Sequence, residues 1–480
     1  MSNLPAALVQ SLQKAKGFDK EAFEKVHAAE EQITSIRFNP AKFSSVVFES
    51  VATRFSSPLQ KIPWASAGYY LPERPSFTLD PFFHAGCYYV QEASSMFLEE
   101  ALTQCVNISQ PLKVLDLCAA PGGKSSLLQS VISSDSLLVS NEVIKSRVTV
   151  LEENLTKWGQ ANLVITNNDP KDFARLESFF DVLVVDAPCS GSGLFRRDSE
   201  AIDEWSEQNV QLCSQRQQRI IADCWPCLKE DGVLIYSTCS YSVEEDEQIL
   251  DWLIENFSVE SIRLSVKPEW NIVETVSSKE NAYGYRFWPD RVKGEGFFIA
   301  CLRKKDGASK SGRNLWKQKL ERADKKEAAV VEPWLKKDIA VDLVKTGQAL
   351  LSIPRQHSQS IEALIAASLY IRQAGVRIGK IAGKDLVPDH ALALSGIVSD
   401  ELVAVSLKHE HAIQYLRREE VEMGWIEIPG TGNQKMAGQT ATVRPGWALI
   451  QYQSIPLGWI KILQNRINNY YPKEWRILRK

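Results

Sequence analysis

Short apolar runs alternate with longer amphipathic stretches through the middle of the chain, from residue 112 to residue 303. Such alternation is typical of a parallel sheet whose strands are joined by crossover helices. The apolar runs predict strands at residues 113–116, 137–141, 163–166, 181–185 and 232–237, and a final edge strand at 294–302. Amphipathic periodicity predicts helices at 145–158 and 210–228. The middle of the chain is therefore expected to fold as a doubly wound, Rossmann-like α/β domain.

The pattern changes on both sides of this region, and a chain of 480 residues is long enough for two or three domains. Residues 1–100 show helical periodicity interrupted by the segment that ends at Pro40, which predicts an N-terminal α+β extension. The sheet domain follows at 101–305. A basic linker at 306–330 and a separate C-terminal domain at 331–480, in which strands and turns are expected, complete the predicted layout.

Composition narrows the class of protein. The N-terminus lacks the pattern of a signal peptide and no apolar stretch is long enough to span a bilayer, so a soluble, cytoplasmic protein is expected. Nine cysteines are too sparse for a disulfide scaffold and are expected to be reduced. The net charge of −3 gives no overall nucleic-acid signature, so a polyanion would have to bind a local basic surface.

Two segments are locally basic. Residues 303–326 hold ten Lys and Arg against three Asp and Glu, which fits a solvated linker and an RNA contact equally well. Residues 461–480 hold six basic residues and one Glu, together with Tyr470, Tyr471 and Trp475. Aromatic rings beside cations can stack on bases, but such rings also fill ordinary cores. Both interpretations stay open for each segment.

A loop of small residues joins the first predicted strand of the central domain to a helix. Its residues are Cys118, Ala119, Ala120, Pro121, Gly122, Gly123 and Lys124. Small side chains let the backbone approach a ligand closely, and the N–H groups of the following helix attract an electronegative partner. The loop lacks both G-x-G-x-x-G and the spacing of a Walker loop. It therefore predicts a site for a nucleotide without phosphates.

Acidic residues follow the next two predicted strands. Glu142 lies 19 residues after Gly123, close to the spacing at which an acid binds ribose hydroxyls in Rossmann-like sheets. Asp169 follows the third strand and could accept a hydrogen bond from the exocyclic amine of adenine. Each acid alone is more often a solvated loop residue or a helix cap than a ligand-binding residue. Their common position at the carboxyl ends of strands, where open α/β sheets bind ligands, favours a nucleoside site.

Two cysteines follow the fourth and fifth predicted strands, so both thiols should lie at the same edge of the sheet as the small-residue loop. Cys189 lies within Asp186-Ala-Pro-Cys-Ser-Gly, and Cys239 lies within Ser-Thr-Cys-Ser. Carbon 5 of cytosine becomes nucleophilic when a thiolate adds to carbon 6, and a second thiol or thiolate can later remove the carbon 5 proton. Spacing alone does not assign the two steps, and analogy with DNA cytosine methyltransferases favours Cys189 as the nucleophile.

The other cysteines are expected to be structural. A single cysteine is more often a small buried residue than a catalytic one, which applies to Cys87, Cys105, Cys213 and Cys301. Cys224 and Cys227 form a C-x-x-C pair, but neither a second pair nor a histidine cluster lies nearby in the sequence. No metal site is therefore expected.

Residues 118–124, 186–191 and 237–240 together resemble the Nop/Sun family of RNA cytosine-C5 methyltransferases. The resemblance implies a class I methyltransferase domain that binds S-adenosylmethionine through this loop, Glu142, Asp169 and Asp186. It also implies the assignment that spacing left open, with Cys239 as nucleophile and Cys189 assisting product release, while Asp186 also faces the target base. Asp290 follows a Pro where the family often has His, so any role of a histidine there is in doubt.

The layout of the whole chain resembles the bacterial members that act on small-subunit ribosomal RNA. Its C-terminal domain resembles, more weakly, a PUA-like RNA-binding module, and its N-terminal extension would also bind RNA. The implied partner is ribosomal RNA, 16S rRNA in particular, or the small ribosomal subunit, with the protein acting as a monomer. Three alternatives are a non-catalytic ribosome-assembly factor, the same chemistry on tRNA, and a nicotinamide-dependent oxidoreductase.

Overall fold

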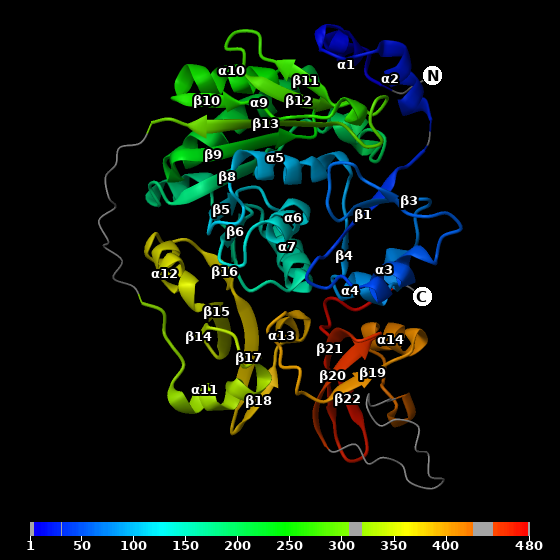
Figure 1. Cartoon of the computed structure of the whole chain (residues 1–480), viewed down its shortest axis with the longest axis vertical. Coiled ribbons are helices and arrows are strands. Elements are labelled where there is room, and N and C mark those ends of the chain that lie inside the picture. The colour runs from blue at the N-terminus through cyan, green and yellow to red at the C-terminus, as the bar shows by residue number, and fades with distance from the viewer. Residues whose placement is uncertain (1–3, 30, 307–318, 426–444, 479–480) are drawn as a thin grey trace.

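The computed structural model describes residues 4–29, 31–306, 319–425 and 445–478, and Figure 1 shows them arranged around one long sheet. The sheet has ten strands in the order β11-β12-β13-β9-β8-β5-β6-β7-β16, with β10 paired to β13. Its strands are β5 (Lys113–Asp116), β6 (Leu137–Asn141), β7 (Leu163–Thr166), β8 (Phe180–Asp186), β9 (Leu228–Thr238), β10 (Val259–Ile262), β11 (Val273–Val276), β12 (Tyr283–Phe287), β13 (Phe297–Lys304) and β16 (Ile371–Ala374). β5 to β9 run parallel, and their order reverses at β5, which is the switch point of a doubly wound sheet.

Helices cover both faces of the sheet because its buried strands carry apolar residues on both sides. Val114 packs into the core beneath one set of helices, and the next residue, Leu115, packs into the core beneath the other. The first set is α5 (Leu98–Cys105), α6 (Gly123–Val131) and α7 (Lys145–Trp158), and the second is α9 (Glu207–Cys224), α10 (Glu247–Asn256) and α12 (Ser358–Ala366). The short helix α8 (Glu200–Glu204) precedes α9. The predicted doubly wound α/β domain is thus confirmed.

The apolar runs located β5 to β9 correctly, and the helix predicted at 145–158 is α7. The helix predicted at 210–228 ends earlier, because a 3₁₀ turn at Trp225–Cys227 separates α9 from β9. The prediction of an edge strand at 294–302 is wrong. β13 lies inside the sheet, antiparallel to β9 on one side and to β10 and β12 on the other. The chain between β9 and β13 supplies further antiparallel strands, which extend the sheet past β13.

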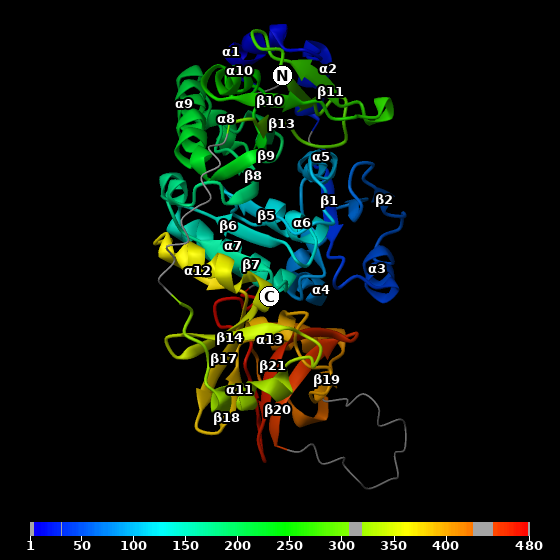
Figure 2. The same cartoon turned by 60° about the vertical axis from the view of Figure 1, so that its left-hand side comes forward.

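The N-terminal extension forms a small sheet with the order β2-β3-β1-β4 beside the central domain. Its elements are α1 (Ala6–Ser11), α2 (Lys20–Ala28), β1 (Thr34–Phe38), α3 (Ser45–Ala52), β2 (Gln60–Lys61), β3 (Gly68–Leu71), α4 (Pro81–His84) and β4 (Tyr88–Val90). α1 and α2 lie apart from that sheet, next to β11 (Figure 2). There Leu8 and Phe23 pack into one cluster with Tyr241 and Trp288, so the first helices cover the chain that follows Cys239.

The chain after residue 319 forms two further sheets, with the orders β14-β15-β17-β18 and β19-β20-β21-β22. Their elements are α11 (Lys325–Val331), β14 (Val341–Thr346), β15 (Ala349–Pro354), β17 (Val376–Ala382), β18 (Asp385–Pro388), α13 (His390–Leu394), β19 (Ala404–Ser406), α14 (His409–Leu416), β20 (Gly446–Tyr452), β21 (Ile455–Ile462) and β22 (Ile467–Asn469). β16 also belongs to this part of the chain, but it pairs with β7 and so forms an edge strand of the central sheet. The predicted domain at 331–480 therefore contains two sheets, and its bounds stay a prediction.

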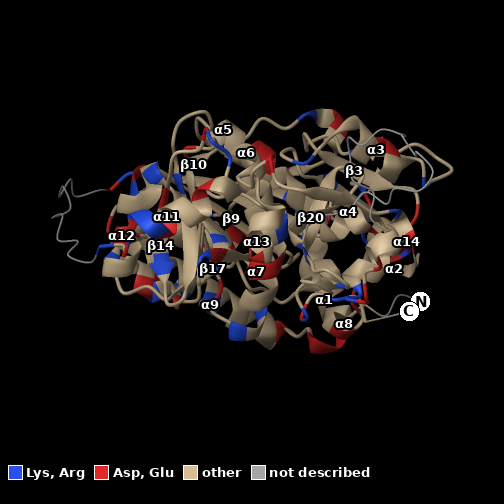
Figure 3. Ribbon diagram, turned by 90° about the horizontal axis from the view of Figure 1, so that it is seen from below, with Lys and Arg blue, Asp and Glu red and all other residues tan. Residues whose placement is uncertain are grey.

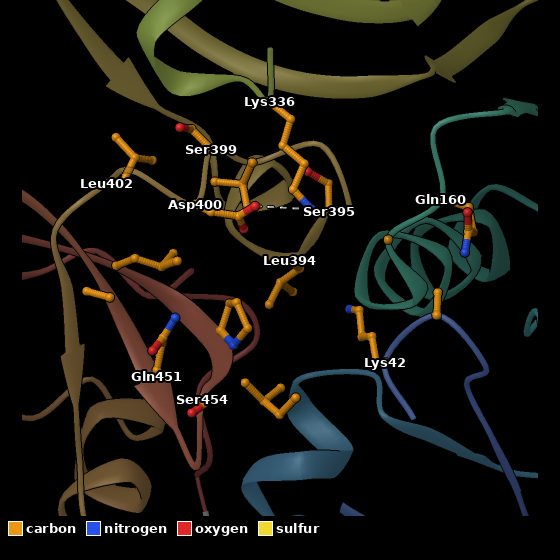
Figure 4. Close-up of a pocket in the computed structure, with 18 of the residues that line it drawn as sticks. Lys42, Gln160, Lys336, Leu394, Ser395, Ser399, Asp400, Leu402, Gln451 and Ser454 are labelled. Carbon is orange, nitrogen blue, oxygen red and sulfur yellow. Dashed lines mark ion pairs between the residues drawn. The ribbon is translucent and has the colours of Figure 1, made fainter. Parts of the chain in front are cut away.

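The N-terminal extension and the last sheet share a hydrophobic core, in which Phe38 and Phe82 pack with Ile450 and Ile460. Where these parts meet the end of α7, a cavity of about 350 Å³ lies between Lys42, Gln160, Leu394 and Ser454 (Figure 4). The Lys42 ammonium donates to the carbonyl oxygens of Ala85 and Lys157 there. Hydrophobic packing and hydrogen bonds to the backbone therefore connect the N-terminal extension with the last sheet and with the end of α7.

Some of the described basic residues in the two basic segments are bound within the protein, and others are exposed. Arg303 donates to backbone carbonyl oxygens and Arg322 pairs with Asp342, while residues 307–318 lie outside the described residues. In the last segment Tyr471 is buried and Trp475 contacts His390, which favours the core interpretation for both. Of the three aromatic residues in this segment, Tyr470 is the one that is exposed, at 38%. Figure 3 shows acidic and basic residues interspersed over α11, α12 and β14.

Among the described helices, none is both long and apolar enough to cross a membrane. Within the same residues, no group of three or more His, Cys, Asp or Glu side chains is placed to hold a metal ion. The four cysteines expected to be structural, and the C-x-x-C pair, are all buried and free.

Candidate active site

Two neighbouring parallel strands deliver the cysteines to one point. Asp186, the last residue of β8, is paired in register with Ser237 of β9. Cys189 therefore lies three residues beyond one strand and Cys239 two residues beyond the paired position on the other. Their sulfur atoms are 2.9 Å apart. The structure thus brings together the two thiols that the sequence placed at the same edge of the sheet.

The surroundings of Cys189 favour its neutral thiol. The hydrogen bond with Cys239, followed by burial, raises the pKa of Cys189 well above its ordinary value. The negative charges of Cys239 and Glu245 act in the same direction. The two thiols therefore share one hydrogen bond, in which either sulfur can be the donor.

Asp186 lies beside the thiols and is held by two partners. Lys124 forms an ion pair with its Oδ2 at 2.8 Å, and the Ser237 hydroxyl donates to its Oδ1 at 2.9 Å. Burial disfavours the charged Lys124 ammonium, but the charge of Asp186 and its hydrogen bond raise the pKa of Lys124 above its ordinary value. Lys124 comes from the start of α6, so this pair connects the small-residue loop to the cysteine site.

The small-residue loop runs between β5 and α6, with Gly122 in the left-handed region at a φ of 110°. Asp116, at the end of β5, is fully buried and accepts a hydrogen bond from Ser125 of α6 at 2.6 Å. Burial raises the pKa of Asp116 to about 7. Cys118 in the loop is also deeply placed, and burial raises the pKa of its thiol. Cys118 therefore contributes a neutral side chain to the small-residue loop.

The acids after β6 and β7 differ in their surroundings. Glu142 is 3% exposed, and its Oε1 accepts from the backbone N–H of Ile144. Arg147 lies 3.5 Å from Glu142 Oε2 and donates to the carbonyl oxygen of Ala120, which links this acid to the loop. The Asp169 side chain is 47% exposed and caps the 3₁₀ turn that follows it by accepting from the N–H of Lys171. The cap considered from the sequence is thus present at Asp169.

The residues at this edge fit a nucleoside cofactor. Two buried carboxylate oxygens, Asp116 Oδ1 and Glu142 Oε2, have no hydrogen-bond donor among the described residues. A buried acceptor of this kind is costly unless a ligand supplies the donor. S-adenosylmethionine carries suitable donors in its ribose hydroxyls and its amino groups. The donor set therefore matches the cofactor, and no phosphate-binding loop is needed for it.

Two functional side chains escaped the sequence interpretation. Asn141 donates to the carbonyl oxygens of Leu117 and Asn168 and accepts from Thr166, so it ties together the loops after β5 and β7. A buried amide that ends an apolar strand was the available signal. Glu245 is 0% exposed and accepts hydrogen bonds from Ser190 and Ser240, the residues that follow the two cysteines. It belongs to a run of four acids, which in a sequence is more typical of a solvated surface.

The doubly wound sheet and the phosphate-free nucleoside site at its carboxyl edge define the class of the protein, an S-adenosylmethionine-dependent methyltransferase with a Rossmann-like fold. Three family models match its successive parts: the N-terminal domain of 16S rRNA methyltransferase RsmF over residues 4–93, 16S rRNA methyltransferase RsmB/F over 104–303, and the methyltransferase RsmF PUA domain over 403–477. The chain belongs to the RsmB/F family of 16S rRNA methyltransferases.

Individual relatives agree with this family. The ribosomal RNA small subunit methyltransferase F of Shewanella loihica is 27% identical over 452 residues, covering 92% of this chain and 88% of that protein. The protein of the same name from Klebsiella pneumoniae is 28% identical over 455 residues, covering 92% and 89%. The resemblance inferred from the motifs is therefore confirmed, and the protein is an S-adenosylmethionine-dependent rRNA methyltransferase. The nicotinamide-dependent alternative is excluded.

Solved structures resemble about two thirds of the chain. A methyltransferase homolog protein from Pyrococcus horikoshii is 29% identical with a TM-score of 0.51, covering 63% of this chain and all of that one. NSun6 from Pyrococcus horikoshii shares the fold at 17% identity with a TM-score of 0.53, covering 64% of this chain and all of that one. The PUA match confirms an RNA-binding module in the C-terminal region, over the last of the four sheets.

Proposed function

We propose that the protein transfers a methyl group to carbon 5 of a cytosine in small-subunit ribosomal RNA, with Cys239 as a covalent nucleophile. The observation that carries the proposal is the 2.9 Å contact between the sulfur atoms of Cys189 and Cys239 beside the nucleoside site. Methylation at a nitrogen or an oxygen needs no thiol, whereas methylation at carbon 5 needs a nucleophile at carbon 6 and a base at carbon 5. The pair supplies both.

The target cytosine must leave its helix to reach the site, so it is expected to be flipped out. The Cys239 thiolate adds to carbon 6, and the electron pair of the carbon 5–carbon 6 double bond makes carbon 5 nucleophilic. S-adenosylmethionine supplies the methyl group. Asp186, fixed by Lys124 and Ser237, faces the base, where its carboxylate can accept a hydrogen bond from the cytosine amine.

Cys189 then completes the reaction. Once the Cys239 sulfur is bonded to carbon it is a neutral thioether, so its contribution to the raised pKa of Cys189 is lost, while the effects of burial and of Glu245 remain. Cys189 releases its proton to water, and its thiolate accepts the proton from carbon 5. The double bond re-forms, the bond between carbon 6 and Sγ breaks, and Cys239 leaves with the electron pair.

The cofactor is assigned to the loop Cys118–Lys124, with Glu142 binding ribose hydroxyls. Asp169 and Asp186 complete the proposed set, with Asp169 at the adenine end. The substrate is proposed to be 16S rRNA or the small ribosomal subunit, met by a monomer in the cytoplasm without a metal ion. Sequencing of bisulfite-treated total RNA with and without the gene would identify the cytosine, and an unchanged pattern would contradict the proposal.

The roles of the two thiols predict opposite behaviour for two variants. Cys239→Ala is expected to abolish methyl transfer, because no bond to carbon 6 can form. Cys189→Ala is expected to accumulate a covalent protein–RNA adduct, because the bond forms but the carbon 5 proton stays in place. A denaturing gel of each variant with substrate RNA and cofactor measures both outcomes. An adduct with Cys239→Ala in place of Cys189→Ala would reverse the assignment.

A further inference from the structure

Glu245 is a buried carboxylate shared by the two cysteine loops. It is 0% exposed and lies in the turn that follows Cys239. Ser190, the neighbour of Cys189, donates to it twice, from its backbone N–H at 2.8 Å and from its hydroxyl at 2.5 Å. Ser240, the neighbour of Cys239, donates from its hydroxyl at 2.6 Å. One carboxylate therefore binds the residues directly after both cysteines.

We infer that Glu245 is a positioning residue that sets the separation of the Cys189 and Cys239 sulfur atoms. Glu245 is the only carboxylate among the described residues that binds both loops, and other hydrogen bonds join them as well. The N–H of Gly193 donates to the carbonyl oxygen of Cys239 at 2.8 Å, and the N–H of Tyr241 donates to the Ser192 hydroxyl at 2.9 Å. The Ser240 hydroxyl lies 3.4 and 3.5 Å from those of Ser190 and Ser192. The inference deepens the proposed function and rests on it, since the separation matters only if both thiols act on one base.

The donors around Glu245 fit an ionised carboxylate. Its two serine neighbours and the Gln217 amide, at 3.0 Å, all present hydrogens to it. An ionised carboxylate accepts through both oxygens, whereas the amide of Gln would accept through only one and would have to donate to the serine hydroxyls through the other. Burial raises the pKa of Glu245, and these hydrogen bonds oppose the rise. The charge of Glu245 also helps to keep the proton on Cys189.

Glu245 is itself fixed from two directions. The Tyr236 hydroxyl of β9 donates to the backbone carbonyl oxygen of Glu245 at 2.6 Å. Two residues further on, Glu247 forms a buried two-pronged ion pair with Arg286, at 2.7 and 2.5 Å. These contacts attach the turn to β9 and β12. The carboxylate is therefore a fixed, buried point to which both loops are hydrogen-bonded.

The first test measures the separation of the thiols directly. Dibromobimane, a short reagent that bridges two nearby thiols, is applied to the wild-type protein and to Glu245→Gln, and the bridged peptide is quantified by mass spectrometry. We expect the yield of the Cys189–Cys239 bridge to fall about tenfold, because loss of a charge-assisted tie frees one loop from the other. Alkylation of single thiols should stay within about twofold.

Asp181→Asn is the matched control. Asp181 lies near the opposite end of β8, where its carboxylate accepts from the N–H of Lys113 at 2.8 Å and from the Lys229 ammonium at 2.5 Å. It loses comparable hydrogen bonds without touching either cysteine loop, so its bridge yield should equal that of the wild type. An undiminished bridge in Glu245→Gln, or an equal loss in Asp181→Asn, would overturn the inference.

Kinetics give a second readout. Glu245→Gln is expected to lower kcat about tenfold or more while KM for RNA and for cofactor stay within about twofold, because neither ligand touches the carboxylate. Rising KM values with unchanged kcat would contradict a positioning role. The bridging test needs no methyl transfer, so absence of cytosine methylation in the wild type would remove the proposed function without changing the bridge yields.

Serine variants keep the test valid if Glu245→Gln does not fold. Ser240→Ala removes the tie to the Cys239 loop, and Ser190→Ala removes one of two ties to the Cys189 loop. Because both serines act through one carboxylate, the loss of bridge yield in the double variant should be smaller than the product of the two single losses. Fully independent effects would show that the serines do not act through Glu245.

Discussion

At the scale of single residues, Gly193 shows how closely the two cysteine loops pack. Its N–H donates to the carbonyl oxygen of Cys239 at 2.8 Å, and its own carbonyl oxygen accepts from Gly296 at 3.2 Å. A methyl group on its Cα would lie 2.6 Å from the carbonyl oxygens of both residues. Real Cβ atoms do not approach that closely, so only glycine fits this position without moving the Cys239 backbone.

Gly193→Ala is therefore expected to displace the Cys239 loop. Such overpacking costs about 1–3 kcal/mol of unfolding free energy, and methyl transfer should fall about tenfold or more because the nucleophile moves. Urea unfolding and a methyl-transfer assay measure the two effects. Gly396→Ala is the control, since a methyl group there meets nothing within 4 Å. Equal behaviour of the two variants would contradict the prediction.

The sequence predicted the thiol pair because each cysteine directly follows an apolar strand, and parallel strands end at one edge. It could not predict Glu245, because the hydrogen bond from Ser190 joins residues 55 positions apart and depends on the exact turn after Cys239. The sequence also could not decide the role of Asp169. A carboxylate beside a strand end is compatible with a cap and with a ligand, and only the structure shows that the cap is made.

At the scale of elements, Arg37 joins β1 of the N-terminal extension to α6 of the central domain. It is 1% exposed and donates to the hydroxyls of Ser126 and Ser130 at 2.6 and 3.0 Å. Its Nε donates to Gln91, and the guanidinium lies 4.6 Å from the centre of the Trp158 ring. Burial lowers the pKa of Arg37 to about 9. The helix that carries Lys124 is thus fixed by a strand outside its own domain.

Arg37→Lys is expected to loosen α6, because one ammonium cannot reach the partners of a planar guanidinium. We expect a loss of about 2–4 kcal/mol in unfolding free energy, from buried acceptors left without donors, and weaker binding of S-adenosylmethionine. Urea unfolding and calorimetry measure these. Arg263→Lys serves as control, because Arg263 pairs with Glu274 at the surface, with its side chain 63% exposed. Cofactor affinity unchanged in Arg37→Lys would contradict this role.

Elements were predicted well where the pattern was local. β5, β6 and β7 match their apolar runs because buried parallel strands read as continuous hydrophobic segments. The edges of the sheet were missed because pairing between distant segments leaves no local signal. β16 pairs with β7 across about two hundred residues, and its residues Ile371–Ala374 show nothing that identifies the partner strand.

At the scale of the whole molecule, two buried histidines lie where the end of the chain meets the other domains. Tyr471 lies between them, with its hydroxyl 3.5 Å from His84 Nδ1 and its ring packed edge-on against His390. Burial and then the charge of Lys157 lower the pKa of His84 to about 4 and that of His390 to about 3. Both side chains are therefore neutral in the folded protein at neutral pH.

This placement predicts acid sensitivity. Between pH 6.5 and about 4 the unfolded chain takes up protons that the folded protein does not, so the unfolding free energy falls as pH falls, by roughly 1.4 kcal/mol per pH unit for each histidine. Above pH 6.5 the contribution is fully present. Urea unfolding at pH 7.5 and pH 5.5 measures it. His390→Phe should lessen the dependence, whereas His409→Gln, at an exposed position, should not.

The strand β16 ties the C-terminal sheets to the sheet that carries the cysteines, and the packing around Tyr471 ties them a second time. These two connections fix the position of the RNA-binding module relative to the central domain. RNA bound to this module would therefore lie at a fixed distance from Cys239. We expect the modified nucleotide to be selected by its distance from the bound part of the folded RNA more than by its neighbours in sequence. With cytosine as the proposed target, a ribosomal helix lengthened by a few base pairs is expected to offer the protein a different cytosine.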